Sequence, residues 1–200
     1  MKRIAIFASG NGSNFEALAA ACEKRRIDAE PVLCVCDHPG AYVTERARRK
    51  GIRTLEFHPK SYGSKKEYEE MILEELKKEN VDLICLAGYM RIVGATLLDA
   101  FPERILNIHP SLLPAFPGVD AIGQALNYGV KVFGVTVHFV DNTLDGGKII
   151  SQAAIPYNGD DREEIETMVH AREHALYVET VANIINSINF NSKQNDNQRN

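Results

Sequence analysis

The sequence has no excess of positive charge and no long apolar run. Lys and Arg number 23 against 27 Asp and Glu, a formal net charge of -4, so the chain has no field that attracts nucleic acid or an anionic membrane. No stretch approaches the roughly 20 apolar residues of a transmembrane helix. The short apolar stretch within residues 1–7 runs directly into glycines, unlike a signal peptide. We therefore expect a cytoplasmic protein without nucleic-acid or membrane partners.

Cysteine is scarce as well. The chain has four cysteines, namely Cys22, Cys34, Cys36 and Cys85. A zinc site would need a second ligand pair at suitable spacing, which the sequence does not offer. We expect free thiols in the core of a protein from a reducing compartment, and no bound metal.

Apolar runs alternate with helical patterns through the first half of the chain. Its 200 residues, 44% hydrophobic and 25% charged, suit one globular domain. Buried strands are predicted at residues 4–8, 32–36, 52–57, 81–87 and 104–108, with helices at 14–24, 42–50 and 66–80. Such alternation predicts a mostly parallel sheet with right-handed crossovers.

The pattern changes after Gly118. A helix at 120–128 precedes two longer strands at 132–140 and 148–156, whose short connection favours antiparallel pairing. A final helix from 161 to about 188 carries its apolar residues on one face.

Together these elements predict an α/β fold. Its open, twisted sheet of about seven strands is flanked by helices, with an antiparallel pair late in the chain and a long C-terminal helix. Residues 1–188 are expected to form one catalytic domain, and 189–200, almost purely polar and rich in Asn, a disordered tail. Because ligands of open α/β sheets bind outside the carboxyl ends of the strands, functional residues should follow strands.

A glycine-rich segment at 9–14 connects the first predicted strand to the first helix. Glycines let the backbone turn tightly, and the amides of a helix N-terminus favour an anion. Gly12, Ser13 and Asn14 are therefore candidates for holding a phosphate. The alternative is a plain connection in which Ser13 caps the helix.

Two rival motifs bear on this segment. A Walker loop would need a following Lys, which is absent, and a dinucleotide-binding fingerprint would need a third glycine where Phe15 stands. Asp37 nevertheless ends the second strand, where a ribose-binding acid belongs, so the dinucleotide alternative stays open.

Asn107 and His109 lie two residues apart on one predicted strand and share a face, while Ile108 points into the core. Pro110 then ends the strand. Amide and imidazole donors side by side suit an acyl transfer, because both can hydrogen-bond the oxygen that becomes negative. Asp145, in a glycine-rich connection, could orient the histidine and stabilise its charged form. Taken singly, His109 could also be a structural histidine at the end of the strand, and Asp145 could simply belong to an Asp-Gly turn.

Five segments resemble, in order, the glycinamide ribonucleotide formyltransferase family of purine biosynthesis. They are residues 9–14, 86–92, 107–114, 137–140 and 144–147. The run Asn-Ile-His-Pro-Ser-Leu-Leu-Pro at 107–114 is highly specific for folate-dependent formyl transfer. The resemblance implies a Rossmann-like formyltransferase fold. It also implies transfer of a formyl group from the co-substrate 10-formyltetrahydrofolate to the amine of N1-(5-phospho-D-ribosyl)glycinamide, without a metal.

The resemblance further implies a role for each matching residue. Asn107, His109 and Asp145 fall on the catalytic trio, and Glu173 falls on an acid near the substrate amine. The residues on the loop that holds the substrate phosphate are Gly12, Ser13 and Asn14. The residues at folate-contacting positions are Lys65, Met90, Arg91, Ile92, Val93, Asn107, Asp141 and Leu144.

Some of these positions have alternatives. Lys65 stands where relatives can have Arg, so a charge is retained but bidentate geometry is not. Glu173 also fits a solvated carboxylate on a charged helix. His138 lies within a matching segment, but we assign it to structure, and Ser111, between two prolines, lacks an evident second base for a nucleophile.

Other enzymes that use 10-formyltetrahydrofolate share the Ser-Leu-Leu-Pro core. Another formyltransferase or a hydrolase is therefore an alternative, although such enzymes carry an additional domain for which we expect no room here. A nucleotide-binding module that uses the 9–14 segment is a second alternative. We expect small-molecule substrates and a monomer or homodimer.

Overall fold

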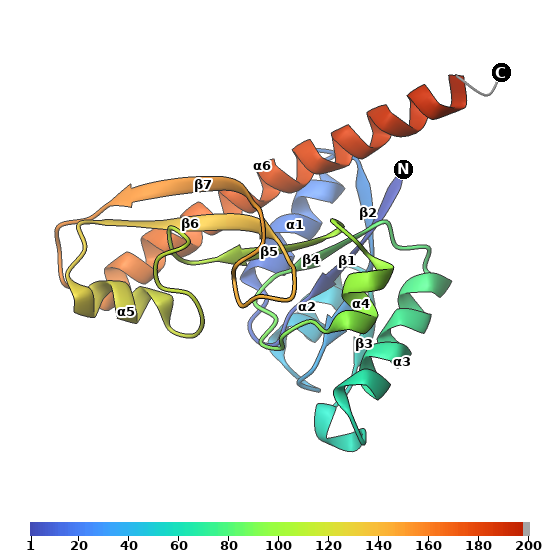
Figure 1. Ribbon diagram of the computed structural model, residues 1–200, viewed down its shortest axis with the longest axis horizontal. Coiled ribbons are helices and arrows are strands. Elements are labelled where there is room, and N and C mark those ends of the chain that lie inside the picture. Colours follow the sequence, from blue (N-terminus) through green and yellow to red (C-terminus); the bar gives the residue numbers. More distant parts are fainter. Residues whose placement is uncertain (198–200) are drawn as a thin grey trace.

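In the described part of the chain, one sheet holds the strands in the order β3-β2-β1-β4-β5-β6-β7 (Figure 1). The computed structural model describes the backbone of residues 1–197 and the side chains of residues 1–188. The strands are β1 (Lys2–Phe7), β2 (Ala29–Cys36), β3 (Arg53–Glu56), β4 (Leu83–Leu86), β5 (Ile105–His109), β6 (Val132–Phe139) and β7 (Ile149–Pro156). The first five pair in parallel, whereas β6 is antiparallel to both β5 and β7. The predicted α/β fold with a late antiparallel pair is confirmed.

Helices connect and cover the strands. They are α1 (Ser13–Glu23), α2 (Tyr42–Arg49), the 3-10 helix η1 (Pro59–Ser61), α3 (Lys65–Lys78), α4 (Ala95–Ala100), α5 (Ala121–Tyr128) and α6 (Arg162–Asn197). Helix α4 was not predicted, because its six residues are too few to display a helical period.

Helix α6 continues past the predicted end near residue 188. It overlaps most of the predicted disordered tail, 189–200, whose last three residues lie outside the described residues. The boundary between domain and tail therefore stays a prediction.

The two faces of the sheet carry separate apolar cores. The first contains Leu106 and Ile108 of β5 and residues of α1, α2, α5 and α6. The second contains Ile105 and residues of α3 and α4. Because side chains alternate along a strand, Asn107 and His109 share the face of Ile105. This confirms that Ile108 points into the core, away from the two polar residues.

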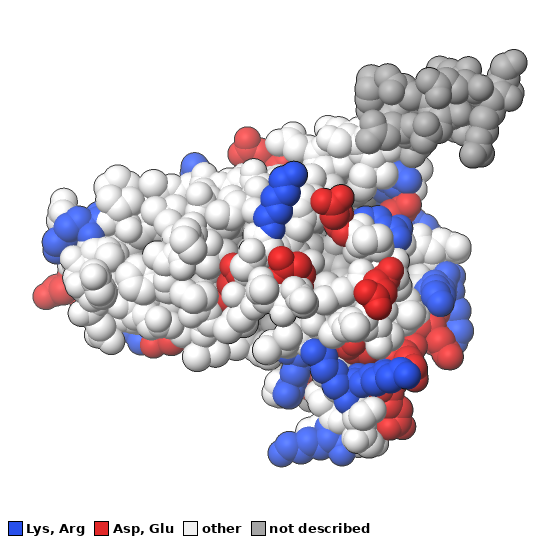
Figure 2. All heavy atoms as spheres, viewed as in Figure 1, with Lys and Arg blue, Asp and Glu red and all other residues white. Residues whose placement is uncertain are grey.

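All four cysteines are buried free thiols in the first core, as predicted. Among the described residues, none of the helices has the length and apolar character needed to cross a membrane. Charged side chains of both signs gather over the α3 end of the molecule, whereas the part over β6, β7 and α5 carries few on the face that Figure 2 shows.

The buried thiols should be unreactive while the protein is folded. Burial raises the pKa of Cys22 and Cys34 to about 12, and the thiolate is the form that reacts. At about pH 8, alkylation of these cysteines is expected to be far slower in the native protein than in urea. Mass spectrometry of the modified peptides measures both rates, and equal rates would show that the thiols are accessible.

Candidate active site

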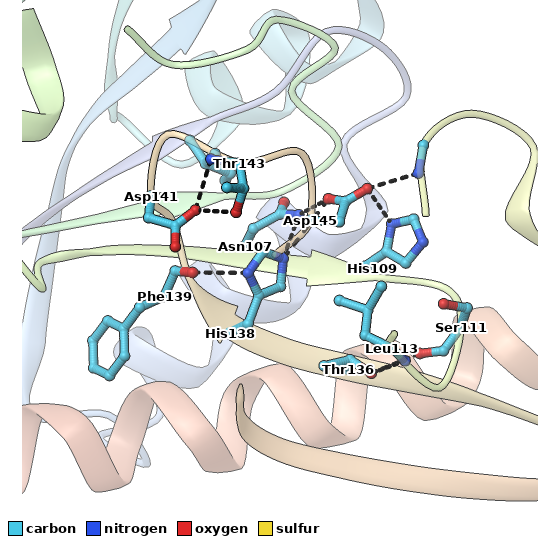
Figure 3. A network of polar contacts seen from close by, with 12 residues as sticks. Asn107, His109, Ser111, Leu113, Thr136, His138, Phe139, Asp141, Thr143 and Asp145 are labelled. Carbon is cyan, nitrogen blue, oxygen red and sulfur yellow. Dashed lines mark hydrogen bonds and ion pairs between the residues drawn. The ribbon is translucent and has the colours of Figure 1, made fainter. Parts of the chain in front are cut away.

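Loops from four parallel strands meet at the carboxyl edge of the sheet. Ser9, after β1, donates its backbone N–H to the Gly88 carbonyl after β4, at 3.0 Å. The Ser9 hydroxyl donates to Asp37 after β2 and accepts the Met90 N–H at 2.8 Å. The loop after β5 and the connection between β6 and β7 reach the same edge (Figures 1 and 3). The predicted site residues that follow strands therefore come from segments that converge.

Asn107, His109 and Asp145 form one cluster (Figure 3). Asp145 Oδ2 lies 3.5 Å from His109 Nδ1 and accepts the Gly118 N–H at 2.8 Å. Asp145 Oδ1 accepts a hydrogen bond from Asn107 Nδ2 at 3.4 Å. The carboxylate thus contacts both β5 residues, and the structure brings together three side chains that span 38 positions of the sequence.

The second ring nitrogen of His109 has its own partner. Nε2 lies 2.9 Å from the backbone carbonyl oxygen of Phe116. A carbonyl oxygen only accepts, so Nε2 carries a hydrogen. The ring is 5% exposed, and it is held between this carbonyl and the Asp145 carboxylate.

The cluster also contains His138, to which the sequence analysis gave only a structural role. It is 2% exposed and lies beside Asn107, with Asn107 Nδ2 3.2 Å from His138 Nε2. His138 Nδ1 lies 2.8 Å from the Phe139 carbonyl oxygen. Burial lowers the pKa of His138, more than the Phe139 carbonyl and Asp145 raise it. The signal that could have found His138 is the pairing register of β5 and β6, which single-strand periodicity does not contain.

Ser111 is not placed as a nucleophile. Its hydroxyl donates to the Ala115 carbonyl at 2.6 Å, and its own carbonyl accepts from the Thr136 hydroxyl at 2.7 Å. These bonds use Ser111 to shape the loop after β5.

The glycine-rich segment begins helix α1. Gly12 is the N-cap at φ 76°, and a Cβ there would lie 2.5 Å from Val43 Cγ2. Both facts require glycine. Gly12 rather than Ser13 occupies the cap position, and the cap has no side-chain hydrogen bond. The alternative in which Ser13 caps the helix is therefore wrong, and the Ser13 side chain remains half-exposed beside the helix N-terminus.

Asn14 and Glu173 meet between α1 and α6. Asn14 Nδ2 lies 3.4 Å from Glu173 Oε2, which also accepts from His170 Nδ1 at 2.8 Å. Glu173 is 5% exposed, so its alternative as a solvated carboxylate is wrong. The hydrogen bond to Glu173 raises the pKa of His170. Among the described residues, buried Asn14 Oδ1 and His174 Nε2 have no hydrogen-bond partner.

Asp37 is engaged within the protein rather than left for a ribose. It is 1% exposed and accepts from the Ser9 hydroxyl and from Arg91 Nε at 2.7 Å. Burial opposes its ionisation, but hydrogen bonds from Ser9, Arg91 and His38 outweigh this and lower the pKa of Asp37. The observation that kept the dinucleotide alternative open therefore has a structural explanation.

The residues proposed to contact folate are spread along the same edge. Met90, Ile92 and Leu144 expose large apolar side chains, at 66%, 64% and 59%. The side chain of Val93 is buried in the second core, which leaves its backbone for a ligand. Asp141 accepts the Thr143 N–H at 2.8 Å and so shapes the β6–β7 connection.

Lys65, the first residue of α3, is joined indirectly to this edge. Its Nζ lies 4.0 Å from Glu69 Oε1, which accepts the Gly94 N–H at 2.7 Å. Glu69 is buried, and burial raises its pKa. Lys65 thus lies beside the end of the loop that carries Met90 and Ile92.

Comparisons with known proteins agree on one family. The model of the formyl transferase family matches residues 2–181. The phosphoribosylglycinamide formyltransferase of Bacillus subtilis (strain 168) is 50% identical over 194 residues, 96% of this chain and 100% of that protein. The crystal structure of glycinamide ribonucleotide transformylase 1 from Symbiobacterium toebii has a TM-score of 0.91 at 46% identity, covering 94% of this chain and 89% of that one. The crystal structure of glycinamide ribonucleotide transformylase 1 from Geobacillus kaustophilus has a TM-score of 0.90 at 49% identity, covering 92% of this chain and 99% of that one.

Proposed function

Because the chain belongs to the formyl transferase family, we propose that it transfers the formyl group of 10-formyltetrahydrofolate to the amine of N1-(5-phospho-D-ribosyl)glycinamide. The products are the N-formyl compound and tetrahydrofolate, in a step of purine biosynthesis. The observation that carries the proposal is the cluster of Asn107, His109 and Asp145 at the strand edge, in a chain 50% identical to a protein named for this reaction.

The transfer is direct, without an acyl-enzyme. The neutral amine attacks the formyl carbon, and the formyl oxygen becomes negative in the tetrahedral intermediate. Asn107 and His109 donate hydrogen bonds to this oxygen, and Asp145 orients His109 and interacts favourably with a positive charge on its ring. The amine then loses a proton and the departing folate nitrogen gains one as the C–N bond breaks.

This mechanism requires two exchanges of partners. The Asn107 N–H that points toward Asp145 Oδ1 donates to the formyl oxygen instead. His109 Nε2 donates to the Phe116 carbonyl in the structure. For Nε2 to stabilise the oxyanion, the formyl oxygen takes the place of this carbonyl, and a small shift of the loop after β5 accompanies substrate binding. The engagement of the Ser111 hydroxyl with Ala115 supports the absence of a serine nucleophile.

The substrate amine compound binds at the α1 end of the site. Its phosphate accepts hydrogen bonds from Gly12, Ser13 and Asn14 at the N-terminus of α1, and Glu173 receives its amine. The contact between Asn14 and Glu173 supports this placement, because it joins the two recognition elements. The unpartnered Asn14 Oδ1 can accept a hydrogen bond from the ligand.

The folate lies along the loop after β4 and the β6–β7 connection. The exposed apolar side chains of Met90, Ile92 and Leu144 provide the contact surface, and Lys65 provides a positive charge for the acidic end. No metal takes part. A cytoplasmic monomer or homodimer, acting on two small water-soluble molecules, completes the proposal.

An absorbance assay of folate deformylation tests the function. We expect tetrahydrofolate formation that depends on N1-(5-phospho-D-ribosyl)glycinamide. The riboside without the phosphate should react about 10- to 10²-fold less efficiently, the range for lost charged hydrogen bonds. Deformylation at the same rate without any amine would indicate a hydrolase, and equal kcat/KM for the two amines would contradict the phosphate site.

A further inference from the structure

Strand pairing places His138 directly opposite Asn107. In the antiparallel register of β5 and β6, Asn107 faces His138 and His109 faces Thr136. Directly opposite side chains share a face of the sheet, with their Cβ atoms about 4.5–5.5 Å apart. His138 is therefore a fixed neighbour of Asn107, and burial at 2% exposure leaves its ring little freedom.

The hydrogen bonds of His138 determine which nitrogen carries its proton. Nδ1 lies 2.8 Å from the Phe139 carbonyl oxygen, and because that oxygen only accepts, Nδ1 carries the hydrogen. In the neutral ring Nε2 then has a free lone pair, which accepts from Asn107 Nδ2 at 3.2 Å. The lowered pKa of His138, caused first by burial, keeps the ring neutral at neutral pH.

This contact orients the Asn107 amide. One N–H of Nδ2 points at His138, and the other points toward Asp145 Oδ1 across a longer distance of 3.4 Å (Figure 3). The terminal torsion of asparagine is broad and admits the flipped amide. A flipped amide would direct its carbonyl oxygen at a developing oxyanion and would repel it.

We propose that His138 is a positioning residue for formyl transfer. It holds one N–H of the Asn107 amide, so that the second N–H, whose contact with Asp145 is long at 3.4 Å, turns from Asp145 to the reacting oxygen when the formyl group binds. This inference rests on the proposed role of Asn107. The charged and titratable groups around the His138 ring are Asp145, whose Oδ1 lies 3.8 Å from Nε2, together with His109 and Asp141. None of these replaces the lone pair that Nε2 offers, because Asp145 contacts the other side of the same amide.

Two variants of His138 separate the effect of its hydrogen-bond acceptor from the effect of its ring shape. His138→Phe keeps a planar ring and has no acceptor, whereas His138→Gln keeps an acceptor oxygen near the position of Nε2. Both lose the Nδ1 hydrogen bond to Phe139, so they are matched in that respect. We expect His138→Phe to lower kcat about 10- to 10²-fold, the scale for a misplaced reacting group, with KM for both substrates nearly unchanged. His138→Gln should recover most of kcat.

Coupling to Asn107 is the decisive readout. In an Asn107→Ala background, His138→Phe should cause no further loss in single-turnover transfer, because its partner is absent. Full additivity, or a His138→Gln variant as slow as His138→Phe, would overturn the inference. If the wild-type protein transfers formyl and His138→Phe equals it, the positioning role fails while the proposed function stands. Without transfer by the wild-type protein, the function itself fails.

The wild-type protein offers a test that does not depend on a folded variant. Imidazole nitrogen NMR shifts distinguish a protonated from an unprotonated ring nitrogen. We expect His138 with hydrogen on Nδ1 and none on Nε2 at neutral pH. Hydrogen on Nε2 would make the ring a donor to Asn107 and would overturn the inference, whether or not His138→Phe folds.

Discussion

Replacing Asn107 or His109 by alanine is expected to lower the turnover of formyl transfer by about 10²–10³-fold, the usual cost of removing one oxyanion donor. The double variant should lose less than the product of the two factors, because residues that act on the same atom are strongly non-additive. The physical basis is their shared face on β5 and their common contact with Asp145. Single-turnover kinetics in a double-mutant cycle measures the coupling.

Folding must be checked in this cycle. His109 is buried at 5% exposure, so His109→Ala removes packed atoms and should lower the melting temperature. Circular dichroism and thermal melting separate this loss from the catalytic one. Small, fully additive losses in folded variants would show that the two residues do not share a reacting oxygen.

Asp145→Asn is expected to lower turnover by roughly 10²-fold or more, with smaller changes in substrate affinity. The variant keeps the size of the side chain but loses the charge beside His109 Nδ1. The backbone should accept it, because Asp145 has φ 50° and asparagine tolerates this left-handed conformation. Steady-state kcat and KM for both substrates, measured between about pH 6 and pH 8 where histidine changes charge, give the result.

Asp160→Asn is the matched control for this change. Asp160 is exposed and follows β7, whereas Asp145 precedes it. The same loss of one charge should therefore leave turnover unaltered. Asp145→Asn with wild-type turnover across that pH range would reject the orienting role. Equal losses in the two variants would attribute the effect to net charge.

Local patterns accounted for the strands, most helices and the family. The apolar runs of β1, β2, β4 and β5 reflect burial on both faces of a central sheet, and such burial is visible in a few consecutive residues. The common face of Asn107 and His109 follows from the two-residue period of a strand. The family was recognised correctly, because the 107–114 run is itself a local feature.

Three contacts could not be predicted, because each joins residues distant in sequence. His138 meets Asn107 across 31 positions, Arg91 meets Asp37 across 54, and Glu173 meets Asn14 across 159. The first requires the register of β5 and β6, the second the order of the strands in the sheet, and the third the packing of α6 beside α1. Periodicity within one element carries no information about any of these.

By itself, the sequence determined the α/β class and the presence of an amide, an imidazole and a carboxylate in segments that follow strands. Only the tertiary structure decided that Asp37 accepts hydrogen bonds from Arg91 and Ser9. It also decided that Glu173 is buried against Asn14 and that His138 faces Asn107. The physical reason is that the type of an element follows from neighbouring residues. Its partners follow from the single arrangement in which both apolar cores are buried and the polar groups at the strand edge are hydrogen-bonded.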